Sequence, residues 1–157
     1  MSSNIAERLV ARLEPLLDQD RIKFHGNIPS PHIVIDEFLN KEVAQQVACE
    51  FPPIEDTRWN RFSHVNDKKL AYNTELDLPP TVKRLIDALS SNTFVRYMEK
   101  LTKVEGLVPD HFSSGAMHYT LAGGYIKLHL DPTVHPVDPC LKRQFNLLIY
   151  LNENWEE

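Results

Sequence analysis

The chain has 157 residues, the usual size of a single domain, and 42% hydrophobic and 25% charged residues, which excludes collagen-like, low-complexity and wholly disordered proteins. Its net charge of −5 argues against binding to nucleic acid, and its longest wholly apolar run, residues 147–151, is too short to cross a membrane. The two cysteines are too few for a disulfide scaffold, and no signal-peptide pattern opens the sequence, so we expect a cytoplasmic protein.

The first two thirds of the sequence have helical character. Apolar residues at spacings of three and four predict helices over residues 5–17, 41–51, 80–89 and 93–103. Asn40 is the expected N-cap of the second helix. A β-branched run over residues 31–39 predicts an early strand, and residues 54–80 are expected to be irregular. Within that stretch, the candidates for a substrate-covering segment are Trp59, Arg61, Phe62 and Tyr72.

The character changes near residue 110. Residues 115–121 and 125–131 are typical of strands, and the Gly-containing residues 122–124 between them predict a turn. A proline-rich loop follows, and residues 144–152 predict a buried strand. The predicted order is therefore helices first and strands after, an α+β arrangement whose last part resembles the opening half of a β-sandwich or barrel.

The most informative residues are His129 and Asp131, which lie two apart in a predicted strand. Side chains at that spacing share one face, so an imidazole and a carboxylate are expected side by side, with Lys127 on the same face. Leu128 and Leu130 are expected to pack on the opposite face. A neutral imidazole with a hard carboxylate suits a divalent iron that must keep coordination positions open for oxygen and a co-substrate.

The wider context carries a family resemblance. Tyr119 and the Gly123-Gly124 pair precede His129-x-Asp131, and Arg143 is followed by Tyr150-Leu151-Asn152-x-x-Trp155. This combination resembles the 2-oxoglutarate- and iron(II)-dependent dioxygenases of the prolyl 4-hydroxylase type. The resemblance implies that residues 1–108 are a mainly helical support and that residues 109–157 form the first strands of a double-stranded β-helix, the jelly-roll or cupin-like barrel.

The resemblance also implies roles for individual residues. His129 and Asp131 match two iron ligands, and Tyr119 and Tyr150 match tyrosines that line the 2-oxoglutarate pocket, where a phenol can donate to a carboxylate. Arg143 matches a family arginine that could touch substrate, and the face of Lys127 makes it a second candidate for that role.

The implied reaction hydroxylates a C–H bond with O2 and converts 2-oxoglutarate to succinate and CO2, with ascorbate as a further candidate cofactor. The substrate would be a prolyl residue, a free amino acid or another small molecule, with no nucleic-acid or membrane partner.

The family pattern continues with a further Gly-Gly strand, a distal His ligand and an Arg or Lys that binds the far carboxylate of 2-oxoglutarate. No residue of this sequence matches these features. We therefore expect residues 1–157 to be one incomplete domain, the N-terminal part of such an enzyme, with little or no turnover by itself.

Two other interpretations remain open. The chain could be a degenerate barrel that has kept its fold, lost catalysis and acts as a binding protein. It could also be a different metalloprotein, such as a hydrolase, in which His135 joins His129 and Asp131 as a local third ligand.

Overall fold

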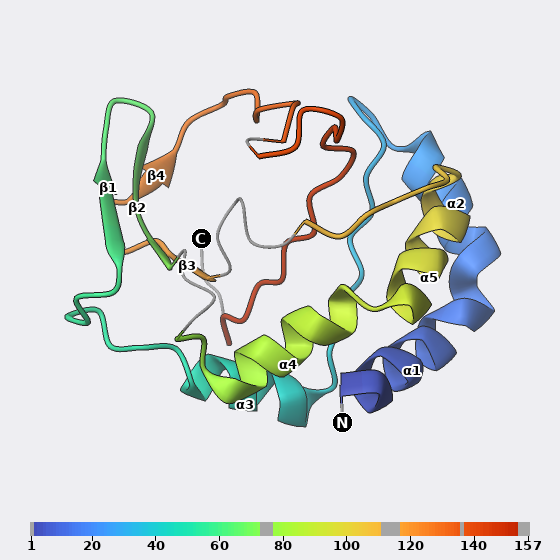
Figure 1. Cartoon of the computed structure of the whole chain (residues 1–157), viewed down its shortest axis with the longest axis horizontal. Helices are drawn as coiled ribbons and strands as arrows, with labels where there is room; N and C mark the ends of the chain where they lie inside the picture. Colours follow the sequence, from blue (N-terminus) through green and yellow to red (C-terminus); the bar gives the residue numbers. More distant parts are fainter. Residues whose placement is uncertain (1, 73–76, 111–116, 136, 154–157) are drawn as a thin grey trace. The chain divides into compact units, whose positions relative to one another are not determined.

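The computed structural model describes residues 2–72, 77–110, 117–135 and 137–153 (Figure 1). The chain is mixed α+β, and it divides into two compact units: Met1–Glu50 with Pro79–Pro109, and Phe51–Leu78 with Asp110–Glu157. The expected order of helices first and strands after is wrong, because two strands lie in the sequence before the last two helices.

The first unit is helical. It contains α1 (Ser2–Leu13), a short 3-10 helix (Glu14–Leu16), α2 (Leu17–Gly26), α3 (Lys41–Cys49), α4 (Pro80–Leu89) and α5 (Asn92–Thr102). Helix α1 packs against α4 and α5, α2 packs against α5, and α3 packs against α4. Helices lie in all four predicted segments, but the first segment, residues 5–17, is interrupted after Leu13, and α2 was not predicted beyond Leu17. Among the described residues, no helix has the length and apolar character needed to span a membrane.

Local contacts explain where these helices begin. The Asn40 side chain accepts a hydrogen bond from the Val43 amide at 2.8 Å, which confirms the predicted N-cap of α3. Helix α4 begins after Pro79, which has no capping side chain. Its first turn is capped from a distance by Glu50, whose carboxylate accepts from the Thr81 amide at 2.6 Å and from the Thr81 hydroxyl. These bonds lower the pKa of Glu50 although burial alone would raise it.

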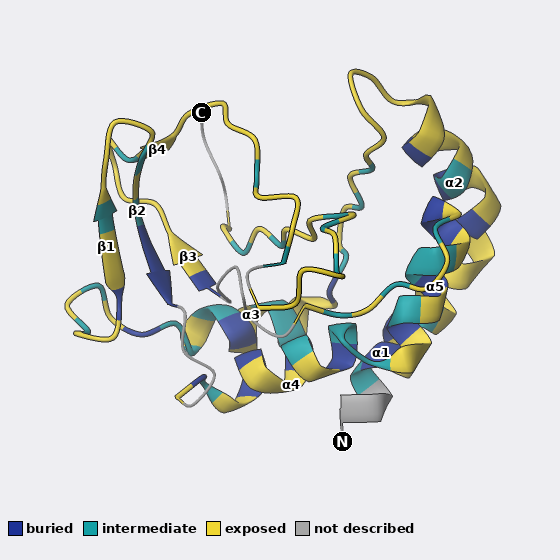
Figure 2. Cartoon of the chain, turned by 45° about the horizontal axis from the view of Figure 1, so that its top comes forward, coloured by how far each residue is buried: buried dark blue, intermediate teal, exposed yellow. Residues whose placement is uncertain are grey.

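The helices meet along their apolar stripes to form the core of this unit. The buried core side chains include Leu9, Leu13, Phe24, Val82, Leu85, Phe94, Tyr97 and Leu101. Figure 2 shows buried residues in dark blue along α1, α2, α4 and α5. The Tyr97 hydroxyl lies in the core and has no hydrogen-bond partner among the described residues, and burial raises the pKa of Tyr97 to about 12.

Residues 31–39 do not form the predicted strand. Their β-branched side chains are suited to a strand, but no neighbouring strand in the described part of this unit pairs with them. The backbone is held instead by the Arg12 guanidinium, which donates to the carbonyls of Glu37 and Phe38. Val34 is 80% exposed, whereas Leu39 at the end of the run is buried.

The second unit contains a small antiparallel sheet built around β2 (Asp67–Tyr72). Strand β1 (Asn60–Ser63) pairs with one edge of β2, while β3 (Met117–Tyr119) and β4 (Tyr125–Ile126) pair with the other edge. The prediction that residues 54–80 are irregular is therefore wrong, since β1 and β2 form a hairpin there. The missed signal is the alternation of Leu70 and Tyr72, which share one buried face of the sheet.

The predicted turn at Gly123-Gly124 exists, but it does not reverse the chain. Leu70 pairs with Tyr119, and Lys68 pairs with Tyr125. Between these two pairs the chain advances by two residues along β2 and by six residues along the opposite edge. The four additional residues form a bulge between β3 and β4, which follow one another along β2. Gly123 has a φ of +73°, and the Gly124 amide donates to the Leu121 carbonyl at 2.7 Å, which closes the bulge.

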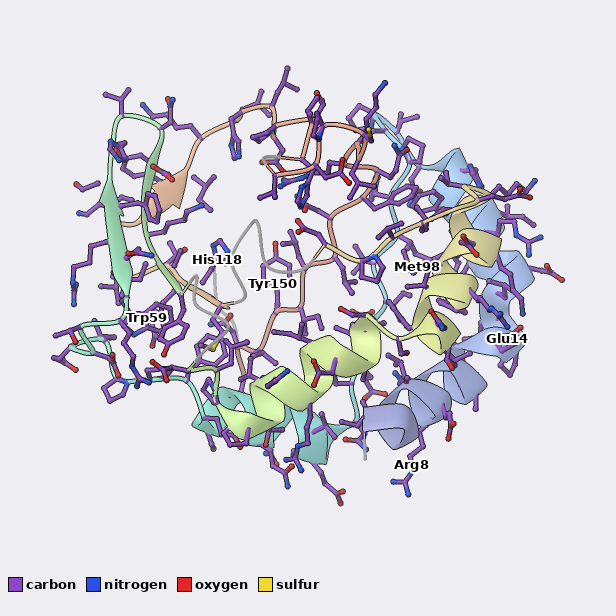
Figure 3. The ribbon with its side chains drawn as sticks, in the orientation of Figure 1. Arg8, Glu14, Trp59, Met98, His118 and Tyr150 are labelled. Carbon is purple, nitrogen blue, oxygen red and sulfur yellow. The ribbon has the colours of Figure 1, made fainter. Side chains whose placement is uncertain are left out.

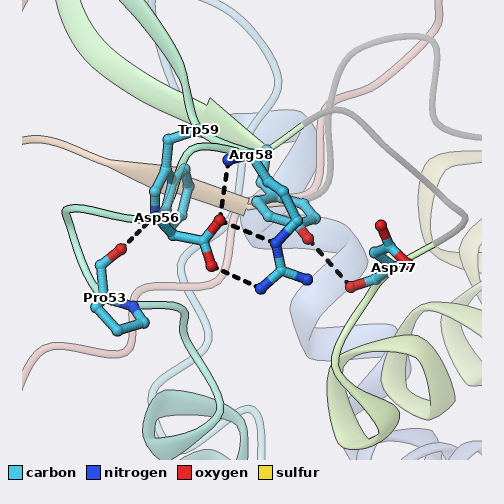
Figure 4. A network of polar contacts seen from close by, with 6 residues as sticks. Pro53, Asp56, Arg58, Trp59 and Asp77 are labelled. Atoms are coloured by element: carbon cyan, nitrogen blue, oxygen red, sulfur yellow. Dashed lines mark hydrogen bonds and ion pairs between the residues drawn. The ribbon is translucent and has the colours of Figure 1, made fainter.

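An aromatic cluster forms the buried face of the sheet around Trp59, labelled in Figure 3. The Trp59 ring makes edge contacts with Tyr72 at 5.4 Å and with Tyr119 at 6.3 Å between ring centroids. Its indole N–H donates to the Pro53 carbonyl at 2.9 Å, as Figure 4 shows. Beside it, two hydrogen bonds from the Arg58 side chain and one from its amide lower the pKa of Asp56 to about 2. Together these contacts fix the segment that enters β1.

Three predicted strands are shorter than expected or missing. Residues 115–121 form β3 only at Met117–Tyr119, and residues 115–116 lie outside the described residues. Residues 125–131 pair with β2 only at Tyr125 and Ile126, because β2 begins at Asp67; one further hydrogen bond, from the Lys127 amide to the Asn66 carbonyl, follows the paired residues. Leu128 and Leu130 are almost fully exposed, so their predicted packing on the opposite face is wrong. Residues 144–152 form no strand among the described residues, and a jelly-roll barrel is neither shown nor excluded.

Candidate metal site

The two predicted iron ligands lie against each other, as their spacing of two residues indicates. The His129 Nε2 atom is 3.2 Å from Asp131 Oδ1, and both side chains are partly exposed. This juxtaposition arises although the segment is not part of a strand. The segment is fixed to the sheet by the Lys127 amide, which donates to the Asn66 carbonyl at 2.8 Å.

The orientation of the His129 ring determines what can lie between the pair. His129 Nδ1 is 2.7 Å from the Lys127 carbonyl oxygen, and because a carbonyl only accepts, Nδ1 must carry the proton. In the neutral imidazole, the Nε2 lone pair then faces a carboxylate oxygen. His129 Nε2 and Asp131 Oδ1, which are 3.2 Å apart, attract each other only if a second proton lies between them or a cation binds both. A backbone carbonyl bound to Nδ1 is also the usual outer partner of a metal-binding histidine.

The other oxygen of Asp131 is held by two donors. Arg143 Nη1 lies 2.8 Å and Asn146 Nδ2 lies 2.7 Å from Asp131 Oδ2. Burial would raise the pKa of Asp131, but the hydrogen bond from Asn146 and the charge of Arg143 outweigh it and lower the pKa. The carboxylate is therefore kept ionised, with Oδ1 turned toward His129. Sequence reasoning missed Asn146, whose only signal is an amide side chain within an apolar run.

The geometry of the pair can be compared with that of a metal site. Two donors at about 2.1 Å from one ion and at right angles to each other lie about 3.0 Å apart. The observed distance of 3.2 Å between Nε2 and Oδ1 matches that separation. The ionised carboxylate and the available imidazole lone pair are the donor types that divalent iron accepts. The two residues therefore fit adjacent positions on one divalent cation.

The two predicted substrate contacts have different surroundings. Arg143 forms the ion pair with Asp131 described above, and its amide donates to the Thr133 carbonyl at 2.9 Å. The Lys127 ammonium lies 5.7 Å from the centre of the Tyr125 ring, a cation–π contact. Arg143 is therefore in direct contact with Asp131, and the backbone carbonyl of Lys127 is in contact with His129.

The two tyrosines predicted to bind 2-oxoglutarate are not brought together with His129 by any observed contact. Tyr119 packs against Trp59 and borders a hollow that His129 does not line. Tyr150, labelled in Figure 3, is 83% exposed. Trp155, the last residue of the family pattern, lies outside the described residues. Their roles stay predictions.

His135 does not join the pair as a local third ligand in this structure. Its Nδ1 accepts hydrogen bonds from the amides of Val137 and Asp138, and its Nε2 lies 3.5 Å from Asp110 Oδ1. Both ring nitrogens are thus engaged elsewhere. Within the described ranges, no three His, Cys, Asp or Glu side chains converge on one point as a complete metal-binding group.

Comparisons of the chain with protein-family models, curated proteins and solved structures gave no match. The functional interpretation of the site therefore depends on the contacts of His129 and Asp131 and on the resemblance in the sequence.

Proposed function

We propose that the second unit carries the metal centre of an iron(II)- and 2-oxoglutarate-dependent oxygenase within the first part of a jelly-roll barrel. The single observation that carries the proposal is the geometry of His129 and Asp131. Their donor atoms are separated as two adjacent ligands of one ion would be, and the Lys127 carbonyl holds the other ring nitrogen of His129. An isolated histidine and aspartate on a surface need no such outer hydrogen bonds.

The residues of the chain have distinct tasks in this proposal. His129 Nε2 and Asp131 Oδ1 would hold the iron. The Lys127 carbonyl keeps the proton on His129 Nδ1, while Arg143 and Asn146 keep Asp131 ionised and turned toward the histidine. When bound, iron(II) supplies the redox chemistry by which O2 and 2-oxoglutarate hydroxylate a C–H bond, leaving succinate and CO2. Tyr119 and Tyr150 are proposed to donate to 2-oxoglutarate carboxylates.

Metal binding by the purified chain tests the proposal. Iron(II) would be titrated anaerobically, with bound metal counted after desalting. We expect about one ion per chain in the wild type, and loss of binding in His129→Ala and Asp131→Ala. Asp36→Ala, which removes an exposed carboxylate from the other unit, should bind as the wild type does. Unchanged far-ultraviolet circular dichroism would show that the variants are folded.

Two results would contradict the proposal. One is a wild-type chain that retains no iron. The other is an Asp131→Ala variant that binds iron as tightly as the wild type, in which case the two residues form only a surface ion pair and the chain is better explained as a binding protein. The absorption band of an iron–2-oxoglutarate chelate is a separate measurement. We expect it to be weak or missing, because no residue is assigned to the far carboxylate.

We also propose a reducing, cytoplasmic location. Cys49 and Cys140 are both exposed and form no disulfide, which is the expected state of thiols in that compartment.

A further inference from the structure

A small hollow opens on one face of the sheet in the second unit. It has a volume of about 230 Å³, and neither His129 nor Asp131 lines it. Pockets for drug-sized ligands usually enclose about 300–1,000 Å³, so this hollow suits a smaller molecule. The residues that line it come from β1, β2, β3 and the bulge, and they include Arg61, Ser63, Lys68, Leu70, Tyr119 and Leu121.

The register of the hairpin formed by β1 and β2 (Figure 1) places two cations on the same face of the sheet. Arg61 lies opposite Leu70, and Ser63 lies opposite Lys68. Residues two apart in a strand share a face with their directly paired partners, so Arg61 and Lys68 are diagonal neighbours on one face. Such neighbours are about 7–8 Å apart, a separation that two long side chains can close around one anionic group.

Neither of these two cations has an acidic partner among the described residues. The Arg61 Nη2 atom donates to the Ile54 carbonyl oxygen at 2.6 Å, which orients the guanidinium but leaves its charge uncompensated. The Lys68 ammonium forms no ion pair or hydrogen bond with any described residue. Because like charges on one face repel each other, an anion placed between Arg61 and Lys68 would be attracted by both.

The other two basic residues of this segment are neutralised within the chain. Arg58 Nη2 lies 2.6 Å from Asp56 Oδ2, and Lys69 Nζ lies 3.7 Å from Asp67 Oδ2. Asp67 and Lys69 alternate to the face of β2 opposite Lys68, so their ion pair forms away from that side chain. The uncompensated charge of the segment is therefore concentrated at the hollow.

We propose that this hollow binds a small molecule through a carboxylate or phosphate group, with Arg61 and Lys68 as the two cationic contacts. Guanidinium and ammonium groups form strong charge-assisted hydrogen bonds with both kinds of oxyanion. The Ser63 hydroxyl on the same face is a further donor, and Leu70 and Leu121 border the space for an uncharged part of the ligand. The site needs no metal, so it goes beyond the proposed function.

NMR titration of the isotope-labelled whole chain, without metal and at constant ionic strength, tests this inference. The probes are inorganic phosphate and propionate, which distinguish the two kinds of anionic group. We expect at least one probe to give saturable shifts at Arg61, Ser63 and Lys68. Its affinity should fall by about tenfold or more in Arg61→Gln and in Lys68→Gln, because each variant loses a charge-assisted hydrogen bond. Arg96→Gln and Lys41→Gln remove exposed cations of the other unit and should bind the probe as the wild type does.

Three results would overturn the inference. The first is that neither probe gives saturable shifts at these residues, and the second is that Arg61→Gln and Lys68→Gln bind the probe as the wild type does. In either case the two cations form an ordinary solvated face. The third is that 2-oxoglutarate binds more tightly than either probe and loses its binding in the same variants, which would assign the hollow to the co-substrate. Because these measurements use no metal, their failure leaves the proposed metal centre standing.

Discussion

Substitution of Gly124 tests the structure of the bulge between β3 and β4, which precedes the segment that carries His129 and Asp131. A Cβ atom at this position would lie 2.7 Å from Thr120 Cγ2, 2.8 Å from the Leu121 carbonyl oxygen and 2.8 Å from the Lys68 carbonyl oxygen. Two of these neighbours are backbone atoms that a rotamer change cannot move. The Gly124→Ala variant must therefore shift β4 away from β2 or distort the bulge.

The expected cost can be estimated from comparable overpacking, which destabilises proteins by about 1–3 kcal/mol. For a chain of this size, about 2 kcal/mol corresponds to a decrease in Tm of about 4–8 °C. Gly123→Ala should cost about 1–2 kcal/mol for a different reason, since its φ of +73° is unfavourable for alanine although nothing lies within 4 Å of the new Cβ. Gly26→Ala, in open space at the end of α2, should stabilise by about 0.4–1 kcal/mol.

Urea unfolding followed by circular dichroism measures all three variants on one scale. The reasoning predicts an order in which Gly124→Ala and Gly123→Ala lie below the wild type and Gly26→Ala lies above it. If Gly124→Ala were as stable as Gly26→Ala, the close approach of β4 to Lys68 would be refuted, and with it the placement of the ligand segment.

Three further predictions concern single contacts. Glu50→Ala should lower the free energy of unfolding by about 1 kcal/mol at pH 7, because the α4 cap is lost, whereas the exposed control Glu55→Ala should leave it unchanged. Because the pKa of Glu50 is lowered in the folded state, the difference in stability between wild type and Glu50→Ala should decrease as the pH falls below the usual pKa of 4.5. Urea titrations at several pH values measure this difference. Tyr97→Phe should raise the free energy of unfolding by up to about 1 kcal/mol, since the buried Tyr97 hydroxyl has no hydrogen-bond partner among the described residues. A lower urea midpoint in this variant would contradict the prediction. Asp56→Asn should flatten the loss of stability between pH 3.8 and about 2, the interval in which the wild-type carboxylate loses its Arg58 partner, as thermal unfolding at several pH values would reveal.

Local patterns predicted helices and the contact between His129 and Asp131; the role of these two residues as metal ligands stays a prediction. Helical spacing and the Asn40 cap are set by neighbours within a few residues, so the sequence contains them directly. The same holds for His129 and Asp131, which contact each other at a spacing of only two residues. These features do not depend on what the rest of the chain does.

Strand predictions failed where the presence or absence of a neighbouring strand determines the structure. Residues 31–39 have strand-forming side chains but no neighbouring strand, and the segment after Ile126 extends past the first residue of β2. The hairpin of β1 and β2 was missed for the opposite reason, because pairing forms a strand from a polar sequence such as Asp67-Lys68-Lys69. The contact of Asn146 with Asp131 likewise joins segments distant in sequence, which no local pattern encodes.

The exposure of Leu128 and Leu130 on either side of His129 has a consequence for how the pair responds to solution conditions. Apolar packing does not hold this stretch, so its shape depends on hydrogen bonds and on the partly exposed ion pair of Asp131 with Arg143. Mobile ions weaken such an attraction. Concentrated salt should therefore lower the affinity of His129 and Asp131 for a cation, whereas salt would have little effect on ligands held in a packed strand.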